Sequence, residues 1–161
     1  SNPARNTYYK TFSSSMQRIL ASYCRSGGNL LVSGAYVGSD MDNSQGNRDF
    51  IQNILKYRYG NSLKTDGDKI AVQGLGRTFT LPRLPNEQDY PVTSPDCILP
   101  MSPAFPVMTY AIGNTPAAVA YQGSDYRTFV MGFPFESIRE ETSRNVIMAS
   151  ILRFLTTDYT D

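Results

Sequence analysis

The sequence predicts an α/β domain, a three-layer sandwich with a mostly parallel sheet that ends in a β-hairpin and a helix. Three observations support this fold class. A stretch with helical periodicity near the start leads through two glycines into a short apolar run. A strand that is apolar on both faces is typical of a sheet covered by helices on both sides. Near the end, two β-rich runs flank a short turn and precede a second helical pattern.

The first helix is expected from about Thr7 to Arg25 because apolar residues recur there at helical spacing. The row that we expect to be buried consists of Phe12, Met16, Ile19, Leu20 and Tyr23. Gly27 and Gly28 end this helix, since glycine tolerates left-handed conformations. The apolar run 30–32 then forms a strand, for which we expect a central place in the sheet.

A polar loop follows, and a second helix is expected after it, with Asn47 as N-cap and Gly60 at its end. Its apolar stripe consists of Phe50, Ile51, Ile54 and Leu55. Short strands are predicted at 70–72 and 78–81. Seven prolines lie between Pro82 and Pro106, so we expect a long irregular segment there.

The last third is predicted as a hairpin and a helix. Strands are expected at 116–121 and 127–133, joined by a turn at 123–125. The buried face of the terminal helix is expected to contain Ile147, Ile151, Phe154 and Leu155. Ser137 and Glu140 have the spacing of a capping box ahead of this helix.

The length of 161 residues, 40% of them apolar, suffices for one sizeable core and is too short for two ordinary domains. We therefore expect one domain over 1–161, either by itself or as a fragment of a larger protein. No apolar run approaches the roughly 20 residues that cross a bilayer, so membrane insertion is not expected. The net charge is only +1, so nucleic acid is not an expected partner.

The chain contains no histidine, which excludes catalytic triads that depend on an imidazole. It contains two cysteines, Cys24 and Cys97, too few for a four-thiolate zinc site. They form either one disulfide or two buried thiols. The acidic run 40–44 lacks the glutamate of an EF-hand loop. We therefore expect no metal and no cofactor.

Two segments follow predicted strands and so fall where α/β sheets place ligand sites. In the first, Ser33 and Gly34 end a strand, where a ligand can approach the backbone and N–H groups can hold an oxyanion. A plain strand-to-loop turn is the alternative, because no histidine is present to activate Ser33. Ala35, Tyr36 and Ser39 are further candidates for ligand binding in this segment.

In the second segment, Glu136 follows Phe133 and Phe135, which are also candidates for ligand binding. Desolvation by the two rings would raise the carboxyl pKa and let Glu136 act as an acid. Glycoside hydrolysis needs a second carboxylate, and Asp40 or Asp42 is the candidate.

A structural role is the alternative for this glutamate. Glu136 would then cap the following helix, whose first turn favours acidic residues, or pair with Arg139 or Arg144.

Two runs carry a family resemblance. The run 19–34 reads Ile-Leu-Ala-Ser-Tyr-Cys-Arg-Ser-Gly-Gly-Asn-Leu-Leu-Val-Ser-Gly. It resembles the helix, Tyr, Gly-Gly, apolar strand and Ser-Gly signature of class I glutamine amidotransferase-like domains in large secreted and surface proteins of Bacteroides and relatives. The run 129–136, Phe-Val-Met-Gly-Phe-Pro-Phe-Glu, followed by Arg144 and Met148, resembles the closing part of those domains. Some of these proteins carry the names xanthan lyase or N-acetylmuramoyl-L-alanine amidase.

The resemblance implies a flavodoxin-like fold and a secreted, periplasmic or cell-surface location. True glutamine amidotransferases use a cysteine on a strand-to-helix elbow together with a histidine and a glutamate. This chain has no histidine, and neither Cys24 nor Cys97 lies in a glycine-flanked elbow, so we expect a catalytically degenerate domain. Its expected partners are polysaccharide or other domains of the parent protein. The alternatives are a polysaccharide or peptidoglycan hydrolase or lyase that uses Glu136 with Asp40 or Asp42, and a structural spacer.

Overall fold

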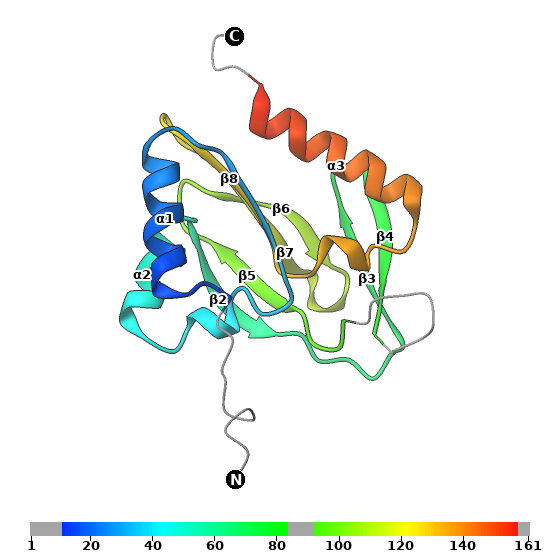
Figure 1. Ribbon diagram of the computed structural model, residues 1–161. Helices are drawn as coiled ribbons and strands as arrows, with labels where there is room; N and C mark the ends of the chain where they lie inside the picture. The colour runs from blue at the N-terminus through cyan, green and yellow to red at the C-terminus, as the bar shows by residue number, and fades with distance from the viewer. Residues whose placement is uncertain (1–10, 84–91, 158–161) are drawn as a thin grey trace, which may run out of the picture.

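The computed structural model describes residues 11–83 and 92–157. It contains a six-stranded sheet in the order β1-β8-β7-β6-β3-β4 and a two-stranded sheet of β2 and β5 (Figure 1). The strands are β1 Leu30–Ser33, β2 Tyr57–Ser62, β3 Lys69–Gly74, β4 Arg77–Pro82, β5 Asp96–Pro100, β6 Phe105–Tyr110, β7 Thr115–Gln122 and β8 Arg127–Met131. The helices are α1 Ser14–Arg25, α2 Gln45–Asn53 and α3 Glu141–Thr156, with short 3-10 turns η2 Ser39–Met41, η3 Ile112–Asn114 and η4 Phe135–Ser137.

The α/β class is confirmed, but the prediction of a mostly parallel sheet is wrong. In the described sheet only β1 and β8 pair in parallel, and the other neighbouring strands are antiparallel. Short connections cause this for β3–β4, β6–β7 and β7–β8, because parallel neighbours need a crossover of a dozen or more residues. The turn between β3 and β4 consists of Leu75 and Gly76, both at positive φ, and the predicted hairpin of β7 and β8 is present.

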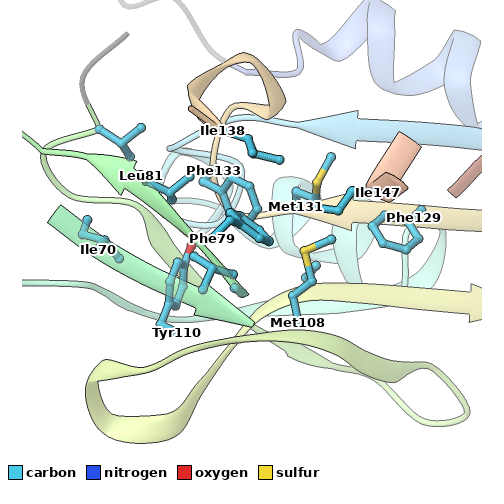
Figure 2. Close-up of a cluster of buried hydrophobic side chains, with 14 of the residues drawn as sticks. Ile70, Phe79, Leu81, Met108, Tyr110, Phe129, Met131, Phe133, Ile138 and Ile147 are labelled. Atoms are coloured by element: carbon cyan, nitrogen blue, oxygen red, sulfur yellow. The ribbon is translucent and has the colours of Figure 1, made fainter. Parts of the chain in front are cut away.

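The six-stranded sheet separates two hydrophobic cores. On β8, Phe129 and Met131 enter the core beneath α3, whereas Val130 enters the core with α1, α2 and the small sheet. Successive side chains of a strand point to opposite faces, so one strand serves both cores. Figure 2 shows the core beneath α3, in which Phe133 and Ile147 meet side chains of the sheet. Helices therefore cover both faces of the sheet, as the sequence predicts.

The central place predicted for the first strand is wrong, because β1 lies at the edge of the sheet. Its apolar residues are half-buried: Leu31 packs against the core beneath α3, and Leu30 and Val32 pack against the other core. The apolar composition of β1 therefore reflects the fact that both of its faces are covered. It carries no information on whether β1 has a neighbouring strand on each side.

The buried face predicted for the first helix is largely wrong. Met16, Ile19 and Tyr23 are 46%, 68% and 48% exposed. Of the predicted row, Phe12 is buried and Leu20 packs against the core with α1, α2 and the small sheet, which the fully buried Cys24 of α1 also enters. α1 carries two rows of apolar side chains. The described residues cover the row with Leu20 and Cys24 and leave the row with Met16, Ile19 and Tyr23 exposed.

The helix starts also differ from the prediction. α1 begins at Ser14, and α2 is capped by the Ser44 side chain, which accepts a hydrogen bond from the N–H of Asn47. The predicted capping box is absent, because Ser137 lies in η4 and donates to the carbonyl of Pro134, while Glu140 makes no side-chain cap. The buried face of α3 is confirmed, with Ile147, Ile151 and Leu155 buried and Phe154 half-buried.

The proline-rich segment is more regular than predicted. It contains β5 and β6, and Pro106 lies where the register of β6 against β7 shifts, so the missing proline N–H is tolerated there. Residues 84–91, part of this segment, lie outside the described residues. The predicted end of the second helix at Gly60 is wrong, because α2 ends at Asn53 and residues 57–62 form β2, in which only Tyr57 is buried. None of the helices in the described ranges is long and apolar enough to span a bilayer.

Candidate functional site

The parallel pairing of β1 with β8 brings the two predicted site segments, 33–42 and 132–139, together at the carboxyl ends of these strands, which form one edge of the sheet. Ser33 is aligned with Met131, and the N–H of Gly34 donates to the carbonyl of Met131 at 3.2 Å. The Ser33 hydroxyl accepts a hydrogen bond from the N–H of Phe135 at 3.3 Å. Ser33 therefore helps to position η4, and the structure places it beside the segment that carries Glu136.

A buried carboxylate that sequence reasoning missed lies behind this edge. Asp96, the first residue of β5, is fully buried. Its Oδ2 accepts hydrogen bonds from the N–H of Gly38 at 3.0 Å and from the N–H and Oγ of Ser39 at 2.6 and 2.9 Å. Its Oδ1 accepts from the Ser62 hydroxyl at 2.9 Å. The carboxylate thus fastens the loop after β1 to the small sheet.

The backbone of Asp96 makes further links to the same edge. Its N–H lies 3.1 Å from the carbonyls of both Ala35 and Gly132, and its own carbonyl accepts from the Tyr110 hydroxyl at 2.9 Å. A Cβ added to Gly132 would lie 2.1 Å from this carbonyl oxygen. Glycine is therefore required at 132 for β5 and the end of β8 to approach this closely.

The electrostatics of Asp96 follow from its burial. Desolvation raises the pKa of Asp96, while hydrogen bonds from Ser39, Ser62 and Gly38 oppose this effect. The four donors that face the carboxylate are all neutral. Burial, and secondarily the charge of Asp96, also raises the pKa of Tyr110 well above its usual range. Asp96 therefore has the surroundings of a structural anchor rather than of a solvent-facing acid.

The predicted catalytic carboxylates have other partners or face solvent. Asp42 forms an ion pair with Arg48, at 3.1 Å between Nε and Oδ1. Asp40 accepts a hydrogen bond from the Thr11 hydroxyl at 2.9 Å. Glu136 is exposed in η4.

The aromatic enclosure predicted for Glu136 is not formed. Phe133 is fully buried in the core beneath α3, and Phe135 is half-buried against that core. The rings pack inward while the carboxylate lies at the surface.

The aromatic residue most available at this edge is Tyr36, which is 52% exposed. Its loop is held on both sides, by Asp96 and by the Tyr57 hydroxyl, which donates to the carbonyl of Val37 at 2.7 Å. An exposed ring on a fixed loop offers an apolar face on which a sugar can stack.

Both cysteines are buried and unbonded, which resolves the alternative left open by the sequence. Cys24 lies in the last turn of α1 and Cys97 in β5. Burial raises the pKa of both thiols, although hydrogen bonds to Thr115 and Asn61 partly offset this for Cys97. A thiol with a raised pKa is protonated at neutral pH and is a poor nucleophile.

Two open cavities of the described part of the chain are lined by residues other than the candidates at 33–42 and 133–136. One of about 490 Å³ lies between the turn of β3 and β4 and strand β6, and includes Arg77 and Thr109. The other, of about 710 Å³, lies between α1 and α2. No candidate site residue predicted from the sequence lines either cavity. Within residues 11–83 and 92–157, no three Cys, Asp or Glu side chains gather as a metal site would require.

The signal for Asp96 was present but ambiguous. Pro95 and Asp96 together read as a turn, and only the apolar Cys97, Ile98 and Leu99 that follow indicate a strand whose first residue is buried. The donors to its carboxylate come from two distant segments, 38–39 and Ser62, so no local pattern reveals them.

No family model and no curated protein matches the chain. Among solved structures, it is similar to a catalytic mutant of Gan42B, a GH42 β-galactosidase from G. stearothermophilus, with a TM-score of 0.63 and 14% identity. The match covers 89% of this chain and 20% of the β-galactosidase chain. At such identity the similarity concerns the fold alone.

Two further structures have comparable scores. The exo-β-1,4-mannosidase Op5Man5 from Opitutaceae bacterium strain TAV5 matches with a TM-score of 0.59 and 13% identity, over 91% of this chain and 24% of the mannosidase chain. The mmIFT52 N-terminal domain matches with a TM-score of 0.59 and 16% identity, over 93% of this chain and 74% of that domain. The chain therefore spans about a fifth to a quarter of the two glycosidases and most of the third structure.

Proposed function

We propose that this chain is a catalytically degenerate class I glutamine amidotransferase-like domain of a secreted bacterial protein associated with polysaccharide or cell-wall processing. The main observation in support is the burial and the raised pKa of the two cysteine thiols. Cys24 and Cys97 are buried with raised pKa, and the chain has no histidine to deprotonate either one. Glutamine hydrolysis by a cysteine nucleophile needs both an accessible thiol and a base.

The surroundings of the carboxylates also support a non-catalytic domain. Glycoside hydrolysis needs two carboxyl groups that flank the scissile bond, one of them tuned to remain protonated. Asp42 is neutralised by Arg48, and Glu136 lies at the surface outside the two cavities described above. The only fully buried acid in the described ranges, Asp96, is committed to four hydrogen bonds.

The association with carbohydrate has two supports. The fold recurs as about a fifth of a β-galactosidase and about a quarter of a mannosidase, which suits an accessory domain within a larger carbohydrate-active protein. Tyr36 adds an exposed ring on a fixed loop, of the kind that stacks on sugars. A binding experiment tests this association.

The test is a glycan array probed with the purified full chain, followed by turnover assays on each bound glycan. We expect binding without release of new reducing or unsaturated ends, and equal binding by Glu136→Gln. Turnover that disappears in Glu136→Gln would establish the hydrolase or lyase alternative. A chain that binds no glycan would establish the spacer alternative.

A further inference from the structure

A groove between α1 and α2 is lined mainly by polar side chains of both helices. The two helices lie side by side (Figure 1), and the space between them has a volume of about 710 Å³. α1 contributes Ser14, Arg18, Ser22 and Arg25, which follow one another along a single face of the helix. α2 contributes Asp49 and Asn53 at the rim and the buried Phe50 beneath them.

Several polar side chains of this groove have no partner among the described residues, although Gln17 and Asp49 do form hydrogen bonds. Among the described residues, Arg18 and Arg25 have no hydrogen-bond or ion-pair partner, whereas Arg48 pairs with Asp42 and Arg144 binds two carbonyls. Each free guanidinium presents five N–H donors in a fixed fork that fits a carboxylate. The side chains of Ser14, Ser22 and Asn53 likewise make no hydrogen bond within the described residues.

The spacing of the two arginines restricts the ligand. Arg18 and Arg25 are seven residues apart, which is about 10 Å along a helix axis. A ligand that meets both needs two negative groups at this separation, with a hydroxyl or amide group between them to meet Ser22. A polysaccharide with one carboxylate on every second sugar has this arrangement.

A densely charged polymer fits less well. Asp49 lies in the same groove and repels closely spaced phosphates. The net charge of +1 also provides no broad positive surface of the kind on which nucleic-acid affinity depends.

We infer that the groove between α1 and α2 binds a linear acidic polysaccharide, with Arg18 and Arg25 each holding one carboxylate. This inference rests on the proposed function, because it names the glycan class and the site within a glycan-associated domain. The contacts are exposed, so binding weakens as salt increases.

The test measures binding of fluorescein-labelled hyaluronan octasaccharide, which has one carboxylate per disaccharide, by anisotropy at low salt. The variants are Arg18→Gln/Arg25→Gln and the matched control Arg153→Gln, which removes an exposed arginine from α3. We expect the double variant to bind about tenfold more weakly, since an exposed ion pair contributes modestly, and the control to match the wild type. Far-UV circular dichroism checks that each variant is folded.

Every result other than the expected one would overturn the inference. Equal binding by the double variant, stronger binding of neutral chitohexaose, or stronger binding of single-stranded DNA would overturn the inference. Binding of neutral glycans alone would overturn the inference and leave the proposed function intact. A wild-type chain that binds no glycan would overturn both.

Discussion

Ser39 and Asp96 are joined twice, because both the N–H and the hydroxyl of Ser39 donate to the same carboxylate oxygen, at 2.6 and 2.9 Å. These residues are 57 positions apart in the chain. Together with Gly38 and Ser62, they hold the loop after β1 against the small sheet. The shape of this sheet edge therefore depends on a single buried acid.

Replacement of this acid is expected to destabilise the domain. Asp96→Asn places an amide NH2 among groups that all donate, so the free energy of unfolding at pH 7 should fall by about 1–3 kcal/mol. Urea denaturation measures it. The control is Asp42→Asn, which removes a half-exposed ion pair and should change stability by less than about 1 kcal/mol. Equal effects of the two changes would contradict the anchoring role of Asp96.

The pH dependence follows from the raised pKa of Asp96. The folded state holds the proton to higher pH than the unfolded state, so stability falls as pH rises from about 4, the unfolded value, through the folded pKa. The difference in unfolding free energy between wild type and Asp96→Asn should therefore decrease over this window. Urea denaturation at a series of pH values measures it, and a difference that increases with pH would show that the folded pKa is lowered.

The close approach at Gly132 gives a third prediction. Gly132→Ala places a Cβ 2.1 Å from the Asp96 carbonyl, so β5 and β8 must separate and the loss should exceed about 3 kcal/mol or prevent folding. The control is Gly46→Ala in α2, where a Cβ meets nothing within 4 Å. This change should stabilise the helix by about 0.5–1 kcal/mol. Thermal unfolding of both variants measures the contrast, and a Gly132→Ala protein as stable as wild type would refute the packing described here.

The exposed side of α1 gives a fourth prediction. Ile19→Ala removes a side chain that is 68% exposed and should change stability by no more than about 0.5 kcal/mol. Ile147→Ala, the matched change in α3, removes a fully buried side chain and should cost about 2–5 kcal/mol. A large loss for Ile19→Ala in urea denaturation would mean that this side of the helix is covered.

The sequence predicts those elements whose pattern is local. β3, β4, β7, β8 and α3 follow from alternation, turn residues and helical spacing within short windows. The order of the strands is not local, because the partner of β3 in the sheet, β6, lies beyond the proline-rich segment. The place of β6 beside β3 was missed for this reason.

The candidate site was predicted only in part. The meeting of Ser33 with the segment around Phe135 follows from two strands that end at the same edge, and the structure brings them together. The exposure of Glu136 does not follow, because sequence gives no direction to Phe133 and Phe135, whose rings pack inward. Asp96 was missed because its hydrogen-bond donors come from segments far away in the sequence.

We propose that the domain has no glutaminase activity, and glutamate release from glutamine by the purified full chain, with Cys24→Ser/Cys97→Ser as background, measures this most directly. Both thiols are buried with raised pKa and no histidine is present, so the two proteins should show the same absence of glutamate. Release by the wild type that disappears in the double variant would contradict the account.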